Sequence, residues 1–205
     1  SSAVVDAREE PIFGIPLAYA LARYQFKFKL LLRLVVIIPL VLPPLASGSM
    51  LLNAFGPYSL LGQTVPIDFT QSVIGIILSQ LYVASPFIIL PAQAAFEGVP
   101  IRYETAAKVL GKKKSEVFFR ISLPLARTGI LVGMLMAWIR SVGELGATMM
   151  MSYNPHTISI QIFEDNAIGG LKNTVPGIIW LIILSVFALT AFLFIKRHHS
   201  LRFGW

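Results

Sequence analysis

Long apolar runs dominate the chain and predict helices that cross a membrane. Residues 69–96 and residues 173–195 contain no charged side chain, and each run exceeds the roughly 20 residues that a helix needs to span a bilayer. Residues 34–52 form a third uncharged run, and residues 128–151 form a fourth with two charged positions. The pattern predicts an all-α membrane protein, a polytopic helical bundle with four full spans.

A shorter apolar run, residues 12–22, precedes these spans. Its length of about 11 residues, at about 1.5 Å per residue, cannot cross a core of about 30 Å. We interpret it as the end of a longer span that begins before this sequence. Residues 1–10 carry four charges that would be costly at membrane depth and do not resemble a signal peptide. They are uninformative, and residues 11–200 are expected to form one transmembrane domain.

The composition agrees with a membrane protein, since 56% of the residues are hydrophobic and 13% are charged, against about 25% charged in soluble domains. The net charge of +7 does not indicate a nucleic-acid partner, because the basic residues lie between apolar runs rather than on a soluble face. The absence of cysteine excludes disulfides, thiolate metal sites and a cysteine nucleophile.

Connections rich in lysine and arginine alternate along the chain with connections that have almost none. Residues 23–33, residues 97–127 and residues 196–202 are rich in both, whereas residues 53–71 have neither and residues 152–173 have one lysine. The positive-inside rule places the three basic segments in the cytoplasm. Loop 97–127 and the C-terminus are therefore expected to be cytoplasmic, and the even number of spans between them is consistent with this topology.

Prolines interrupt two of the predicted spans, at Pro39, Pro43 and Pro44 in the first and at Pro86 and Pro91 in the second. A proline removes a helical hydrogen bond, and broken membrane helices are tolerated where protein or a water-filled cavity surrounds them. The prolines indicate either a helix that lines a transport pathway or a kinked packing helix.

The cytoplasmic loop, residues 97–127, predicts two short helices, over 101–110 and 115–121, with Gly111 between them and Pro124 at the entry to the next span. The first helix carries adjacent alanines, which another protein can approach closely. Its lysine-rich stretch "AAKVLGKKKSE" fails as a P-loop, because the two required glycines are lysines. ATP, if it is used, must bind elsewhere.

The same loop resembles the EAA loop of ABC-importer permeases, whose pattern is Glu-Ala-Ala, three residues, Gly, nine residues, Ile, any residue, Leu-Pro. The matching positions are Ala106, Ala107, Gly111, Ile121, Leu123 and Pro124. Thr105 stands at the glutamate position, directly after Glu104. Glu104 either takes over the acidic contact or pairs with Lys108 at i,i+4.

Four further stretches, "GIPLAYALAR", "IPLVLPPLASG", "WIRSVGELGATMM" and "YNPHTISIQIFE", resemble the molybdate/tungstate permease group of ABC importers, which is similar to the sulfate permeases. The resemblance implies an inner-membrane homodimer of six-helix subunits working by alternating access, of which this chain would lack the first helix and much of the second. It also implies an ATPase partner, which binds ATP and magnesium and docks at Glu104, Thr105 and the matching positions, and an external oxyanion-binding protein. The permease itself would have no catalytic role and no cofactor. A sulfate or other anion permease of the same architecture is the nearest alternative.

Arg140 and Glu144 lie one turn apart in the fourth run, and the spacing predicts that they share one helical face. They form either an internal ion pair or part of the translocation pathway, in which Arg140 attracts the oxyanion and Glu144 holds the arginine. Pro43 and Pro44 are candidates for the same pathway.

Two other classes are weighed against this prediction. A self-sufficient membrane enzyme would need an acid–base or metal cluster, and an ion-coupled secondary transporter would need a mid-membrane relay and no ATPase. His156, His198 and His199 have no metal-ligand spacing and are expected to be solvated or interfacial, so no metal site is predicted.

Overall fold

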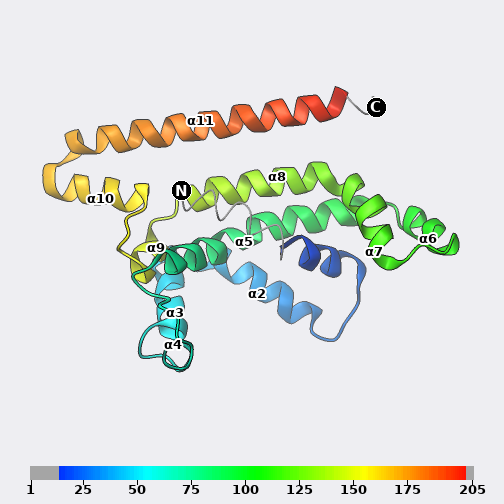
Figure 1. The fold of residues 1–205 in the computed structure, drawn as a ribbon, viewed down its shortest axis with the longest axis horizontal. Coiled ribbons are helices and arrows are strands. Elements are labelled where there is room, and N and C mark those ends of the chain that lie inside the picture. The colour runs from blue at the N-terminus through cyan, green and yellow to red at the C-terminus, as the bar shows by residue number, and fades with distance from the viewer. Residues whose placement is uncertain (1–13, 202–205) are drawn as a thin grey trace.

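The computed structural model describes residues 14–201 of the 205-residue chain, with side chains for residues 14–194 (Figure 1). Residues 1–10, predicted to be uninformative, lie outside the described part. Helical residues 14–23 come first and carry no label in the figure. The labelled helices are α2 (Lys29–Val41), α3 (Pro44–Phe55), α4 (Leu60–Thr64), α5 (Val73–Gly98), α6 (Ile101–Val109), α7 (Lys114–Val117), α8 (Leu123–Val142), α9 (Gly146–Met151), α10 (Ile158–Gly169) and α11 (Leu171–Leu201), with a π-helical turn η1 (Phe118–Ser122) before α8. No strand occurs within residues 14–201, which confirms the all-α prediction.

Helices α5 and α8 pack side by side along the length of the molecule (Figure 1). Small residues on α8, at Gly129, Gly133 and Ala137, recur every four positions and therefore lie on one face. A Cβ on Gly129 would lie 2.5 Å from the Cβ of Ala95, and a Cβ on Gly133 would lie 3.1 Å from the carbonyl oxygen of Ile88. Such small-residue stripes let membrane helices approach closely.

Within the described residues, three helical segments are long and apolar enough to cross a membrane, namely Val73–Gly98, Lys114–Val142 and Leu171–Phe194. The predicted count of four is not confirmed, because residues 34–52 do not form one helix. Helix α2 ends at Val41, and Leu42 and Pro43 are extended with ψ of 137° and 142°. A proline disfavours helical backbone at the preceding residue, so Pro43 and Pro44 divide the run.

The fourth predicted span is also divided. Helix α8 ends at Val142, and α9 begins at Gly146. Glu144 therefore lies in the connection, so the prediction that Arg140 and Glu144 share one continuous helical face is wrong. Gly143 ends the helix, and the Glu144 carboxylate accepts a hydrogen bond from the Ala147 amide at 2.8 Å, as an N-terminal capping side chain does.

The two interruptions meet in space. A Cβ on Gly146 would lie 2.8 Å from the Cβ of Pro44, and a Cβ on Gly48 would lie 2.7 Å from the Cα of Ala147. The start of α3 thus crosses the start of α9 with almost no space between the backbones. We call this crossing the double break, defined by residues 42–48 and 143–147.

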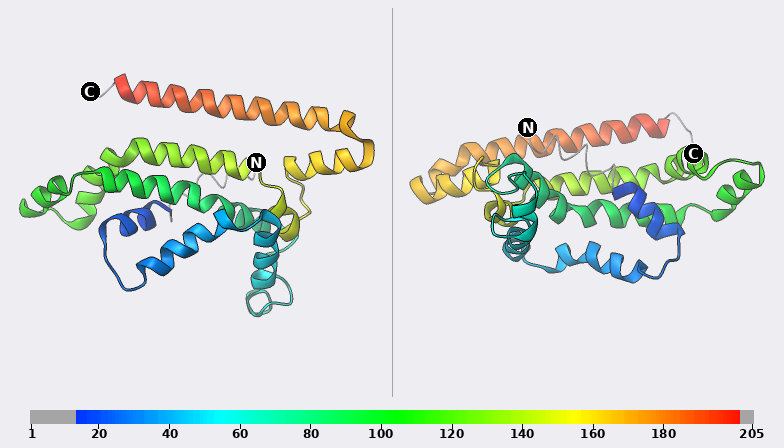
Figure 2. Two further views of the ribbon diagram at one scale, coloured as in Figure 1. Left: turned by 180° about the vertical axis from the view of Figure 1, so that it is seen from behind. Right: turned by 60° about the horizontal axis from the view of Figure 1, so that its bottom comes forward.

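The short helices gather at the two ends of the molecule (Figures 1 and 2). Helices α6 and α7 lie at one end of the α5–α8 pair, whereas α3, α9 and α10 lie at the other. Helix α11 packs on α10 and runs back along the length of the molecule. Its large apolar side chains, such as Trp180 and Phe187, are exposed in the single chain, as expected of a helix that meets lipid or another subunit.

Candidate functional site

Loop 97–127 contains the two predicted helical pieces, α6 and then α7 with η1, joined by a tight turn. Helix α6 ends at Val109, and Gly111 adopts a φ of +79°, a left-handed conformation that glycine adopts without steric cost. The Lys112 amide donates to the Ala107 carbonyl at 3.1 Å, and the Gly111 amide donates to the Lys108 carbonyl at 3.0 Å. These bonds satisfy carbonyls that the helix end leaves free.

The tip of this loop is apolar and exposed. Val109 and Leu110 are 82% and 80% exposed, and Thr105 and Ala106 beside them are also exposed. We call Thr105, Ala106, Val109 and Leu110 the tip surface. Exposed apolar side chains grouped in this way indicate a contact with another molecule.

The other predicted docking residues lie outside this surface and differ in burial. Ala107 is buried, Ile121 and Leu123 are half-buried, Gly111 is exposed in the turn, and Pro124 is exposed at the start of α8. They shape the loop and seat it on the helices, whereas the tip surface is free for a partner.

Glu104 is buried, with 2% of its surface exposed. Its Oε1 lies 2.8 Å from Nε of Arg23 and accepts a hydrogen bond from the Ser122 hydroxyl at 2.9 Å. The Tyr19 hydroxyl donates to Oε2 at 3.3 Å. Glu104 thus pairs with Arg23 rather than with Lys108, and both of its oxygens are occupied within the chain.

The partners of Glu104 were missed by the sequence analysis, which treated Arg23 as a marker of topology. Arg23 also donates from Nη2 to the Val99 carbonyl at 2.7 Å, at the C-terminal end of α5. Arg23 and Glu104 are 81 positions apart, and no local motif links them. The one sequence signal is an arginine directly after an apolar run, combined with a glutamate in the second basic connection along the chain.

Arg140 and Glu144 form an ion pair at the double break, with Nη1 and Oε2 2.5 Å apart. The Glu144 side chain is 1% exposed, whereas the Arg140 side chain is 26% exposed. The hydroxyls of Ser47 on α3 and Ser141 on α8 are buried in this region and have no hydrogen-bond partner among the residues that the structure describes. Pro43 precedes α3 and Pro44 begins it. The region therefore combines one accessible cation with unpaired hydroxyl donors.

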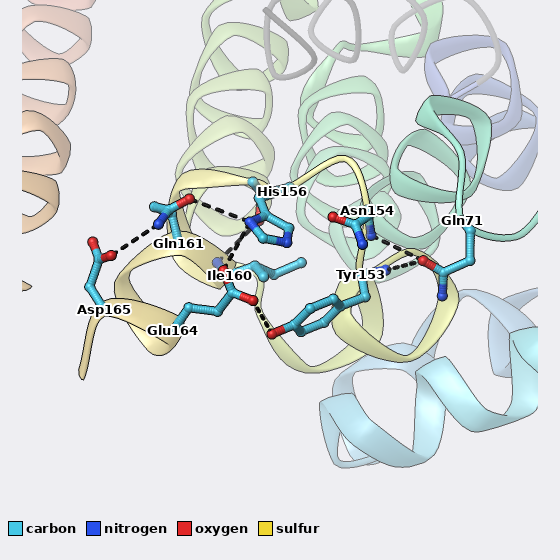
Figure 3. Close-up of polar contacts among 9 residues, drawn as sticks. Gln71, Tyr153, Asn154, His156, Ile160, Gln161, Glu164 and Asp165 are labelled. Carbon is cyan, nitrogen blue, oxygen red and sulfur yellow. Dashed lines mark hydrogen bonds and ion pairs between the residues drawn. The ribbon is translucent and has the colours of Figure 1, made fainter. Parts of the chain in front are cut away.

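A polar cluster joins the segment between α9 and α10 to α10 itself (Figure 3). The Tyr153 hydroxyl donates to Glu164, and His156 Nδ1 lies 3.1 Å from the same carboxylate. Gln71 accepts hydrogen bonds from the amides of Tyr153 and Asn154, which ties this segment to the start of α5. The hydrogen bond to Glu164 raises the pKa of Tyr153 above its ordinary value, with burial and the carboxylate charge adding to the shift. His156 is exposed, as expected of a solvated histidine.

Comparison with known proteins places this arrangement in a family. Residues 14–202 match the family described as the binding-protein-dependent transport system inner membrane component. The chain belongs to this family. The match runs from the helical residues 14–23 to the end of α11, so it includes loop 97–127 and the double break.

Several members that resemble the chain have named roles. It is 41% identical over 177 residues to a probable molybdenum ABC transporter permease protein of Haloferax volcanii, with 86% of this chain and 65% of that protein covered. It is 34% identical over 185 residues to the molybdate/tungstate transport system permease protein of Pyrococcus furiosus, with 90% and 69% covered. It is 39% identical over 146 residues to the molybdenum transport system permease protein of Escherichia coli, with 69% and 64% covered. The chain thus spans about two thirds of the length of these relatives.

Proposed function

We propose that the chain is the transmembrane subunit of an ATP-driven importer of molybdate or tungstate. The observation that carries this proposal is the exposed tip surface of loop 97–127, at the position where the EAA pattern is expected to contact an ATPase. The relatives named above, which are permeases for molybdenum, molybdate or tungstate, support the substrate class.

The tip surface suits docking into a groove of a partner protein. Val109 and Leu110 supply apolar area at its centre, and Lys112, Lys113 and Lys114 directly after the turn supply positive charge at its edge. A buried apolar centre with a charged rim is the usual arrangement of specific interfaces. The partner ATPase binds ATP and magnesium, while the permease supplies no catalytic residue and no cofactor.

The same proposal includes the remaining parts of the importer. Loop 97–127 and the C-terminus are cytoplasmic, and residues 11–200 form a single transmembrane domain. Two copies of the permease pair around the pathway and receive the oxyanion from an external binding protein. In the membrane, α2 and α3 together cross the bilayer once, with an interruption at Pro43, and this crossing adds to the three long helical segments.

The double break is our candidate for the translocation pathway. Discontinuous helices in transporters place polar backbone and side chains at the substrate route. The partly exposed Arg140 attracts the divalent anion, the buried Glu144 moderates that attraction, and the unpaired hydroxyls of Ser47 and Ser141 are available as donors. A route that attracts an anion weakly also releases it.

Docking is tested by co-purification of the ATPase with permease variants from the native membrane. Leu110→Asp places a charge in the tip surface and is expected to abolish recovery of the ATPase. Leu60→Asp is the matched control, because Leu60 is 85% exposed on α4 near the opposite end. Retention of the ATPase by Leu110→Asp, or equal loss in both variants, contradicts docking at this loop.

The pathway is tested by uptake measurements on complexes that still assemble. Arg140→Gln is expected to lower the molybdate uptake rate about tenfold or more, while Arg140→Lys keeps a substantial part of it. Arg120→Gln serves as the control, because the Arg120 side chain is 72% exposed in the cytoplasmic loop. Unchanged transport by Arg140→Gln in an intact complex removes the residue from the pathway.

A further inference from the structure

The geometry points to Arg23 as a positioning residue that acts through Glu104 and links the coupling loop to helical residues 14–23, so that movement of α6 is passed to that helix. This inference rests on the proposed function, because it assumes that an ATPase moves the loop. It adds a residue and a route of transmission to that proposal.

Arg23 and Glu104 together bond to several separate segments of the chain. Arg23 bonds both Glu104 on α6, at 2.8 Å, and the Val99 carbonyl at the end of α5, at 2.7 Å. Glu104 in turn accepts from Tyr19 and from Ser122 in η1. Four segments, namely residues 14–23, α5, α6 and η1, therefore meet at one charge pair, which we call the joint.

The joint is buried, unlike the other ion pairs at this end. The Arg23 and Glu104 side chains are 9% and 3% exposed. The Arg33 and Glu97 side chains are 41% and 49% exposed, with their charged atoms 3.6 Å apart. An exposed pair is screened by water and contributes little, whereas separating a buried pair leaves a desolvated charge without compensation. The joint therefore resists separation much more strongly than the exposed pair.

Aromatic packing makes the joint stiff. The Tyr19 ring contacts the Phe96 ring on α5 and the Phe118 ring in η1 edge to face, with centroids 5.2 and 4.8 Å apart. On the same helix, Ala18 and Leu21 are fully buried in the core that α5 and α8 form. Close-packed interiors transmit displacement rather than absorbing it, so α6 cannot shift without moving residues 14–23 or breaking the joint.

The test compares Arg23→Gln and Glu104→Gln with the matched control variants Arg33→Gln and Glu97→Gln, and with the charge exchange Arg23→Glu/Glu104→Arg. Each permease is purified with its ATPase and reconstituted in proteoliposomes with molybdate and the binding protein. Three quantities are measured per folded complex: ATPase recovery, ATP hydrolysis rate and molybdate uptake rate. The ratio of uptake to hydrolysis reports transmission, because a merely structural defect lowers the two rates together.

The expected result for Arg23→Gln and Glu104→Gln is retained ATPase recovery and hydrolysis with uptake per ATP reduced about tenfold or more, as misplacement remote from a reacting centre can produce. The control pair keeps the wild-type ratio, and the charge exchange recovers part of it. Should Gln variants not fold, Glu104→Asp and Ser122→Ala, which keep the charge pair, are expected to lower the ratio without loss of assembly.

An unchanged ratio in every folded joint variant overturns the inference, as does a parallel fall of uptake and hydrolysis. Failure of the proposed function gives a different result, because the unaltered permease would then neither recover the ATPase nor take up molybdate.

Discussion

Two buried glutamates, Glu104 on α6 and Glu144 at the double break, pair with arginines in different ways: one with a distant residue and the other with a near one. Glu104 bonds Arg23, Tyr19 and Ser122, which lie 81, 85 and 18 positions away in the chain. Glu144 bonds Arg140 and the amide of Ala147, four and three positions away. The first is a tertiary junction between separate segments, whereas the second holds a local turn.

The two carboxylates hold different parts of the molecule in place. Removing Glu104 leaves Arg23 without its carboxylate partner and removes the acceptor that the Tyr19 and Ser122 hydroxyls share. Removing Glu144 frees the start of α9 but leaves Arg140, whose side chain is 26% exposed, able to reach water. The α6 end is therefore expected to be rigid, and the double break to be adaptable.

The largest effect is expected from Glu104→Ala. It leaves Arg23 buried without a counter-charge, which costs about 3–5 kcal/mol of folding stability. Thermal unfolding of the purified permease in detergent measures the change. A loss comparable with that of an exposed pair, such as Glu97→Ala, would contradict the assignment of Glu104 as a junction.

Glu144→Ala is expected to destabilise the permease by about 2 kcal/mol, because it removes a helix-capping bond and a charged hydrogen bond while Arg140 stays partly solvated. The same unfolding measurement applies, with Glu144→Gln expected to retain part of the capping bond. If Glu144→Ala costs as much as Glu104→Ala, the distinction between the two sites fails.

Gly111→Ala is expected to cost about 1–2 kcal/mol, since the φ of +79° is unfavourable for a residue with a Cβ. Apart from the two chain neighbours, no described residue has an atom within 4 Å of the added Cβ, so the cost is conformational rather than steric. Gly111→Asn, which tolerates this conformation better, should cost less. Equal stability of the three proteins would show that the turn relaxes freely.

The smallest effect is expected from Glu116→Gln. Glu116 lies 3.7 Å from Lys112 and 3.8 Å from Arg120 in pairs that are largely exposed, so the change should be about 0.5 kcal/mol or less. The control is the same measurement at high salt, which should remove even this difference. A loss near that of Glu104→Ala would mean that burial does not separate the two classes of ion pair.

Local features of the fold were predictable from the sequence, and contacts between distant segments were not. Apolar runs indicated α5, most of α8, and α11. Gly111 with its flanking residues indicated the turn between α6 and α7. Prolines indicated an interruption near Pro43, but run length alone suggested a continuous span. The double break and the joint depend on segments up to about a hundred residues apart in the chain, such as Gly48 beside Ala147, and no spacing rule predicts such meetings.

The most direct test of the account is molybdate uptake by proteoliposomes that contain the permease with its ATPase and binding protein. The account predicts uptake that requires ATP, persists when an ionophore collapses the ion gradients, and is inhibited by tungstate more strongly than by sulfate. Uptake that proceeds without ATP and stops when the ion gradients collapse would contradict it, because the chain would then be an ion-coupled transporter.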